Sequence, residues 1–214
     1  MKNNITEVVF ILDKSGSMSG LESDTVGGFN SMLAKQRKEE GEAFVTTVLF
    51  SDTCVTVHDR ESIGAVKNMT PDDYFPAGCT ALLDAMGDTV KHIETVHRYI
   101  RKEDVPQKTL FVIITDGMEN ASRRFSKEDV KAMILQKEEL GWEFIFLGAN
   151  MDAVQTAANY GIRAEHSVTY CCDSVGTQTN FDVVSDVISC ARCSAPMPSN
   201  WKERIERHAK GKKM

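Results

Sequence analysis

The sequence has no long apolar segment, and this absence limits where the protein can reside. No apolar run approaches the roughly 20 residues that a membrane-spanning helix needs. Residues 1–6 are polar, and the apolar run at 8–12 is too short for the core of a secretory signal peptide. We therefore expect a cytoplasmic protein with no membrane segment.

Positive charge is in the minority as well. The chain carries 25 lysines and arginines against 31 aspartates and glutamates, so its net charge is −6. Binding to the phosphates of a nucleic acid requires a basic surface. This balance argues against nucleic acid as the main partner, although the C-terminal residues 201–214 are locally basic.

Motifs of the common enzyme classes are also missing. The chain has neither the G-x-x-x-x-G-K-[ST] phosphate loop nor the H-E-x-x-H zinc motif. Met18 stands at the centre of G-S-M-S-G, where the nucleophile elbow of a hydrolase needs a serine. Ser15 stands two residues after Asp13, where a phosphoaspartyl enzyme would need a second aspartate. We interpret the five histidines as surface or packing residues, so no catalytic constellation is predicted.

What the sequence does contain is a regular alternation of apolar runs and helical patterns, in a composition typical of a globular domain. We predict strands at 8–12, 43–50, 53–58, 108–115, 142–147 and 164–170. Helices are expected at 23–38, 80–102, 126–140 and 152–160, with a last helix marked by Phe181, Val184 and Ile188. The link Ser51-Asp52 is so short that the strands on either side of it are antiparallel. The prediction is a doubly wound α/β fold: a mostly parallel six-stranded sheet with one antiparallel edge strand and helices on both faces.

The length of the chain suits a single domain, which we expect to cover residues 1–195. Residues 196–214 form a basic tail, because six lysines and arginines in 201–214 face only Glu203 and Glu206. We interpret this tail as a solvated terminal helix with a frayed end.

Oxygen-bearing side chains follow two of the predicted strands. Asp13, Ser15 and Ser17 alternate directly after the first strand, and Asp116 ends the strand at 108–115. In a doubly wound sheet of order 3-2-1-4-5-6, both strand ends lie at the crevice where the order reverses. Thr80 opens the helix that precedes the fourth strand, so its hydroxyl can reach the same crevice. Hard cations such as Mg²⁺ prefer oxygen ligands of this kind.

This pattern resembles the metal-ion-dependent adhesion site (MIDAS) of von Willebrand factor type A domains, which consists of D-x-S-x-S, a threonine in a G-G-T-like turn and an aspartate in a T-D-G-like turn. The matching residues are Asp13, Ser15, Ser17, Thr80 and Asp116. The resemblance covers roughly residues 7–170. Cys79 departs from the pattern, because a second glycine is usual there, but Thr80 keeps its place in the motif.

The resemblance implies a bound Mg²⁺ or Mn²⁺ ion and a binding role. In the family the three hydroxyls bind the ion directly, and the aspartates often act through water. An ion held by neutral oxygens keeps its positive charge and retains exchangeable waters. The implied partner is therefore a protein that offers an Asp or Glu side chain or a C-terminal carboxylate. The chain looks like the stand-alone cytosolic members of the family that occur in bacteria and phages.

Two alternatives to a metal-dependent protein-binding module stay open. A metal ion beside carboxylates can also hydrolyse phosphoesters, and Asp84 and Glu119 lie close to the site in sequence. We interpret Asp84 as a residue of the first helical turn or of the surroundings of the metal ligands. The second alternative is a structural or RNA-associated adaptor that uses the fold without the metal, which the basic tail permits.

Four of the six cysteines gather near the C-terminus, at Cys171, Cys172, Cys190 and Cys193. In a reducing cytosol such residues are free thiols. Four thiolates could also bind zinc, but the first pair is adjacent rather than spaced C-x-x-C. We predict that these four cysteines are reduced and bind no metal.

Overall fold

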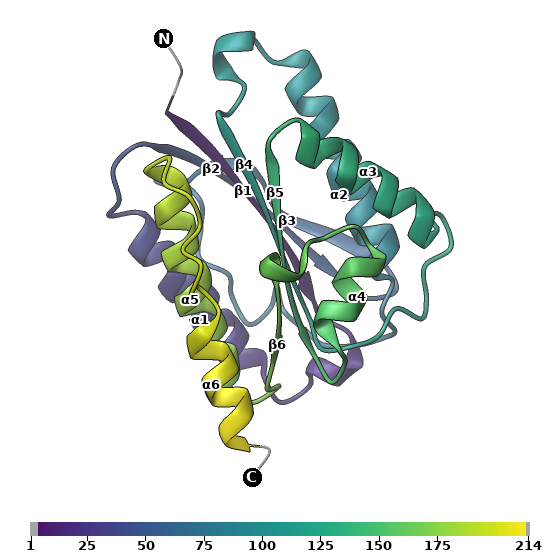
Figure 1. Cartoon of the computed structure of the whole chain (residues 1–214). Helices are drawn as coiled ribbons and strands as arrows, with labels where there is room; N and C mark the ends of the chain where they lie inside the picture. The colour runs from purple at the N-terminus through teal and green to yellow at the C-terminus, as the bar shows by residue number, and fades with distance from the viewer. Residues whose placement is uncertain (1–3, 213–214) are drawn as a thin grey trace.

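The computed structural model describes residues 4–212 and contains one six-stranded sheet of order β3-β2-β1-β4-β5-β6 (Figure 1). Only β3 is antiparallel, and it pairs with β2 at the sheet edge. The predicted doubly wound fold and its strand order are therefore confirmed. The strands are β1 (Ile5–Asp13), β2 (Glu42–Phe50), β3 (Cys54–Ser62), β4 (Lys108–Thr115), β5 (Trp142–Ala149) and β6 (Ser167–Tyr170).

Helices cover both faces of the sheet (Figure 1). One face carries α1 (Glu22–Gln36), α5 (Ser174–Arg192) and α6 (Glu203–Lys212), and the other carries α2 (Leu82–Tyr99), α3 (Lys127–Glu139) and α4 (Ala153–Asn159). Three short 3₁₀ helices, Gly16–Met18, Lys102–Asp104 and Ala164–His166, lie in the connections. None of the helices described between residues 4 and 212 is long and apolar enough to cross a membrane.

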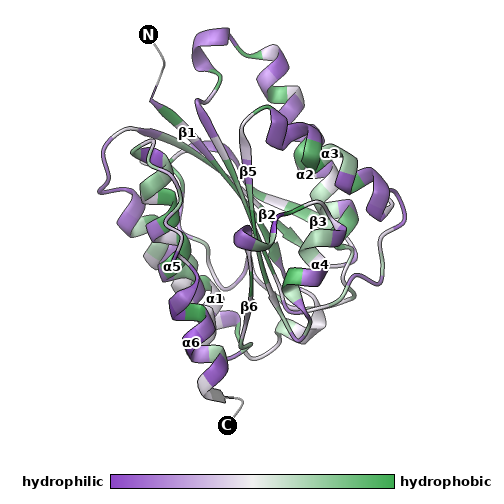
Figure 2. Cartoon of the chain, in the orientation of Figure 1, coloured by the Kyte–Doolittle hydropathy of each residue, from purple (hydrophilic) through white to green (hydrophobic). Residues whose placement is uncertain are grey.

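The central strand β1 explains why the sheet needs helices on both sides. All nine of its residues are buried. Val8, Phe10 and Leu12 belong to the core under α1 and α5, whereas Val9 and Ile11 belong to the core under α2 and α3. A parallel strand that is buried on both faces reads as a continuous apolar run. Figure 2 shows the same pattern, with hydrophobic strands between helices that turn hydrophilic faces outward.

The C-terminal segment differs from the expected tail. Trp201 is 7% exposed and Ile205 is 2% exposed, and both belong to the core cluster that also contains Val168 and Tyr170 of β6. The Trp201 indole N–H donates to the carbonyl of Glu165 at 2.8 Å. The prediction of a solvated terminal helix is wrong for these residues, because two large apolar side chains four residues apart give the segment a buried face.

Candidate metal centre

The five predicted site residues lie where the parallel strands β1 and β4 end. These strands are neighbours in the sheet, with Leu12 paired to Ile114; Asp13 comes one residue after this pair and Asp116 two residues after it. The structure thus places both carboxylates at the crevice that the topology predicts. Ser15 and Ser17 lie in the turn between β1 and α1, and Thr80 lies in the loop before α2.

Asp13 is held in one orientation at the end of β1. Its side chain is 1% exposed. One carboxylate oxygen accepts from the Ser15 backbone N–H at 2.7 Å, and the other accepts from the Thr115 hydroxyl at 2.6 Å. Burial raises the pKa of Asp13 above its ordinary value, and these hydrogen bonds oppose that effect. Holding Asp13 in its charged form at this buried position therefore costs free energy.

Asp116 is linked to Asp13 through the two serines. The Ser17 hydroxyl donates to an Asp116 carboxylate oxygen at 2.6 Å, and the hydroxyl oxygens of Ser15 and Ser17 lie 3.1 Å apart. The Asp116 side chain is 3% exposed, whereas Ser17 is exposed. A hydroxyl that donates its proton to a carboxylate keeps its oxygen lone pairs available. The hydroxyl oxygen of the exposed residue Ser17 can therefore coordinate a cation that arrives from the solvent side.

Thr80 is brought to the same place by the loop after β4. Its backbone N–H donates to the Asn120 side-chain oxygen at 2.9 Å, and its carbonyl accepts from the Asn120 N–H at 3.0 Å. A Cβ atom at Gly117 would lie 2.7 Å from the Thr80 hydroxyl oxygen and 3.5 Å from that of Ser17. Both hydroxyls thus border the space over Gly117, next to Asp116.

The turn before Thr80 tolerates the cysteine at position 79. Gly78 has a φ of +81°, and a Cβ atom there would collide with the Asp52 carboxylate. The Gly78 carbonyl also accepts from the Gly16 N–H at 3.0 Å, which ties this turn to the Asp13 loop. The glycine that the turn requires is therefore present at 78, and the exposed side chain of Cys79 does not displace Thr80.

The donor set fits a hard divalent cation. Two buried carboxylates and three hydroxyls converge, and no lysine, arginine or histidine within residues 4–212 forms an ion pair with Asp13 or Asp116. Two carboxylates at one buried site repel each other unless a cation compensates them. The structure brings the five predicted residues together, and their binding of a metal stays a prediction.

Three residues around the site were not identified from the sequence. Thr115 orients Asp13, and the Tyr74 hydroxyl donates to the Asp13 carbonyl at 2.5 Å. The Cys172 thiol donates to the second Asp116 oxygen at 3.4 Å. Burial, followed by the charge of Asp116, raises the pKa of Cys172 to about 12, so this thiol stays protonated as a donor. Thr115 directly precedes Asp116, but nothing in the sequence links Tyr74 or Cys172 to the site.

Asp84 and Glu119 have structural roles. Asp84 accepts backbone N–H groups of Arg123, Arg124 and Phe125 at 2.9–3.0 Å. Burial acts to raise the pKa of Asp84, but these three hydrogen bonds together lower it. Glu119 accepts the N–H groups of Leu83, Ala121 and Ser122 at 2.8–3.0 Å. Both carboxylates hold the loop that carries Asn120, and their N–H partners occupy the oxygens that a general base would need.

The fold excludes the four-thiolate zinc site that was the alternative to metal-free cysteines. Cys171 and Cys172 precede the N-terminus of α5, whereas Cys190 and Cys193 lie at its C-terminal end. A 19-residue helix is roughly 28 Å long, so the two pairs cannot share an ion. All six cysteines are free thiols in the structure.

A Gly117→Ala substitution is expected to weaken binding of Mg²⁺ about tenfold, or about 1.4 kcal/mol. The added methyl group would force the Thr80 hydroxyl to rotate away from the site, because the present separation of 2.7 Å is too short. Isothermal titration with Mg²⁺ measures the effect. Gly64→Ala is the matched control, because a Cβ atom at that position meets nothing within 4 Å. Unchanged affinity in Gly117→Ala would show that no cation binds over Gly117.

Comparison with known proteins identifies the fold of the chain through similar solved structures. No protein-family model and no curated protein sequence matches the chain. Among solved structures, proximal thread matrix protein 1 from the mussel byssus, with a zinc-occupied MIDAS motif, has a TM-score of 0.60 and 17% identity over 90% of this chain and 47% of that one. A von Willebrand factor type A protein from Catenulispora acidiphila has a TM-score of 0.57 and 16% identity over 85% of this chain and 42% of that one.

A third similar structure is the manganese-loaded TRAP protein of Plasmodium vivax, with a TM-score of 0.57 and 15% identity over 85% of this chain and 74% of that one. The chain spans slightly less than half the length of the mussel and Catenulispora proteins. At these identities the likeness concerns the fold rather than the activity. The chain has the fold of von Willebrand factor type A domains.

Proposed function

We propose that this protein binds a partner protein through a divalent cation, Mg²⁺ or Mn²⁺, held by Asp13, Ser15, Ser17, Thr80 and Asp116. One observation carries the proposal: two buried carboxylates and three hydroxyls meet near the carboxyl ends of β1 and β4, and no basic side chain within residues 4–212 forms an ion pair with either carboxylate. Similar structures that hold zinc or manganese support a divalent ion in this fold.

The partner is proposed to supply a carboxylate, from an Asp or Glu side chain or from a C-terminus. A bound ion supplies positive charge and an exchangeable coordination position. Ser15, Ser17 and Thr80 contribute no negative charge, and the exposed Ser17 marks the side from which a ligand can approach. Phe75 is 75% exposed and Met118 is 68% exposed, and both lie within five residues of Thr80 or Asp116. These apolar side chains can add contact area around a charged anchor.

A phosphoester hydrolase is the second function considered. The carboxylates nearest to the site in sequence, Asp84 and Glu119, are occupied by backbone N–H groups. Within residues 4–212, no histidine has a hydrogen bond or ion pair to the five site residues. These contacts favour binding over turnover, since hydrolysis needs a group to accept the proton of the attacking water.

We also propose a cytoplasmic location, as for the stand-alone bacterial and phage members of the family. The support is the set of six free thiols, which a reducing compartment maintains. A metal-independent adaptor remains the third function, and the partner experiment below distinguishes it from a metal-dependent one.

The test is capture of partner proteins from a lysate on the immobilised chain, followed by elution with EDTA. Thr80→Ala is expected to reduce capture about tenfold, a loss of about 1.4 kcal/mol, because it removes one hydroxyl ligand. Thr80→Ser is the matched control, since it keeps the hydroxyl.

Neutralising one acidic residue on the captured protein should weaken its binding to the chain as much as EDTA does. Capture that persists in EDTA, or in Thr80→Ala combined with Asp116→Ala, would instead support the adaptor.

A further inference from the structure

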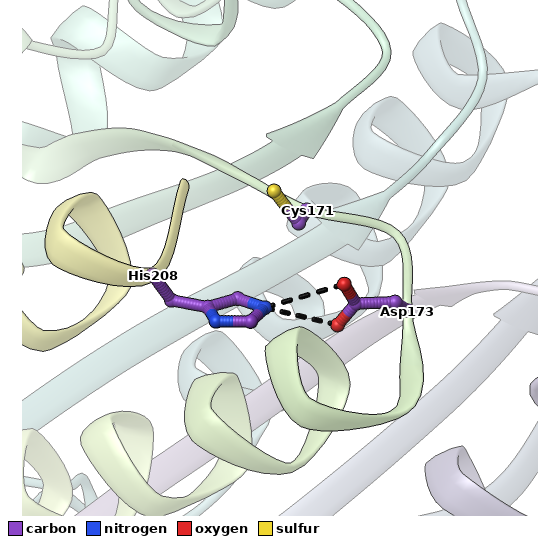
Figure 3. A group of neighbouring side chains, drawn as sticks. All are labelled: Cys171, Asp173 and His208. Atoms are coloured by element: carbon purple, nitrogen blue, oxygen red, sulfur yellow. Dashed lines mark hydrogen bonds and ion pairs between the residues drawn. The ribbon is translucent and has the colours of Figure 1, made fainter. Parts of the chain in front are cut away.

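A second group of metal-ligating side chains lies apart from the five site residues. Cys171 and Asp173 lie in the connection between β6 and α5, and His208 lies on α6. One ligand atom from each of these side chains lies within 4.8 Å of the other two. Figure 3 shows the imidazole and the carboxylate facing each other, with the thiol beside the gap between them.

The fold fixes each of these residues independently. Asp173 caps α5, because its carboxylate accepts the Gly176 N–H at 2.7 Å, and its own N–H donates to the Cys171 carbonyl at 2.9 Å. His208 is positioned because α6 is anchored through the buried side chains of Trp201 and Ile205. The three groups are therefore brought together by packing rather than by mutual attraction alone.

The distances suit a small tetrahedral ion. His208 Nε2 lies 3.0 Å and 3.3 Å from the two Asp173 oxygens. With zinc–sulfur bonds near 2.3 Å and zinc–nitrogen or zinc–oxygen bonds near 2.0 Å, neighbouring tetrahedral ligands lie about 3.3–3.6 Å apart. The Cys171 sulfur lies within 4.8 Å of the other two ligand atoms, so it has to move closer to them to bind the same ion. Asp173 can cap α5 and still ligate, because a carboxylate accepts at several lone-pair positions.

We propose that Cys171, Asp173 and His208 form a second metal site that binds Zn²⁺ or a similar borderline-soft ion. Thiolate and imidazole ligands favour zinc over Mg²⁺, whereas the all-oxygen set around Asp13 favours the harder ion. The ion joins α6 to the β6–α5 connection, so metal binding is linked to the docking of the C-terminal helix.

A cavity lies beside the Cys171 side of the proposed site. A pocket of about 590 Å³ is lined by Cys171 and by Glu206, Ala209 and Lys210 of α6. Water or an exogenous ligand can enter from this side, which is the arrangement of a site with three protein ligands and one open position. The second site is separate from the first, but the two are adjacent, since Cys172 contacts Asp116.

This proposal replaces the expectation that Cys171 binds no metal. The sequence places 34 residues between Asp173 and His208 and offers no recognised ligand spacing. Without zinc, the contact of His208 with Asp173 is an ordinary hydrogen bond between partly exposed side chains. The two interpretations differ in what elemental analysis finds.

The experiment uses the full chain carrying Ser17→Ala, which removes a ligand of the first site. The protein is stripped of metal, incubated with Zn²⁺ in excess Mg²⁺, passed through a gel-filtration column and analysed for zinc. We expect one zinc ion per chain. Adding Cys171→Ser or His208→Gln should abolish retention, whereas Cys193→Ser and His92→Gln, at exposed positions, should not change it.

Cobalt provides a second measurement that does not depend on retention through a column. Co²⁺ bound to the chain should show a thiolate-to-metal charge-transfer band that disappears in Cys171→Ser and persists in Cys193→Ser. The free energy of unfolding in EDTA should be the same for all variants, and this measurement checks that each variant is folded. The proposal is overturned if Ser17→Ala retains no zinc, or if Cys171→Ser and His208→Gln retain as much as their controls.

Discussion

Asp13→Ala is expected to abolish the stabilisation of the protein by Mg²⁺. A ligand that binds only the native state at 100 times its dissociation constant adds about 2.7 kcal/mol to the free energy of unfolding. Asp13 contributes one of the two buried carboxylates of the site. It also orients the turn at Ser15, because its carboxylate accepts a hydrogen bond from the Ser15 backbone N–H. Denaturant unfolding with and without Mg²⁺ measures the gain, which should be present in the unsubstituted chain and absent in the variant.

Two further variants test whether the charge of Asp13 is responsible for this result. Asp13→Asn keeps the shape of the side chain and removes its charge, so Mg²⁺ should no longer stabilise this variant. In EDTA, its free energy of unfolding should be at least as high as that of the unsubstituted chain. Burial disfavours the charged carboxylate, as the raised pKa of Asp13 indicates. Asp72→Ala, at an exposed position, should keep the full gain. If Asp13→Ala gains as much from Mg²⁺ as Asp72→Ala does, the assignment of the site is wrong.

Trp201→Ala is expected to lower the free energy of unfolding by about 3–5 kcal/mol, the range for large aromatic side chains removed from a core. Trp201 is almost fully buried against the sheet and donates a hydrogen bond to the Glu165 carbonyl. Its loss leaves a cavity and an unsatisfied carbonyl under α6. Denaturant unfolding measured in EDTA separates this effect from any contribution of metal.

Arg207→Ala is the matched control for that experiment, since Arg207 lies on the exposed face of α6. We expect its free energy of unfolding to change by less than about 0.5 kcal/mol. If Trp201→Ala is as mild as this control, α6 does not pack in solution as it does in the structure.

The fold was predictable because its signals are local. Continuous apolar runs such as the one in β1 mark strands buried on both faces. The short link at Ser51-Asp52 determines the antiparallel edge. Three helices begin after residues whose side chains cap them, namely Ser126, Asp152 and Asp173. Strand order then follows from the short, right-handed connections of α/β folds.

The C-terminal segment was misjudged because charge dominates its composition. Six basic residues in 201–214 suggest a solvated tail, but burial depends on the few apolar positions that share one face. Trp201 and Ile205 find an apolar surface only because β6 and α5 leave one uncovered. No local pattern indicates whether such a surface exists elsewhere in the chain.

The α/β fold and its strand order could be predicted from the sequence, and so could the meeting of five oxygen-bearing residues near the ends of β1 and β4. These follow from periodicity and from topology, which require only the order of residues along the chain. Only the arrangement of the elements in space shows that Thr115, Tyr74 and Cys172 surround the carboxylates, and that His208 contacts Asp173. Such contacts join residues far apart in sequence, and they depend on side-chain packing between elements, which a single sequence does not encode in any local pattern.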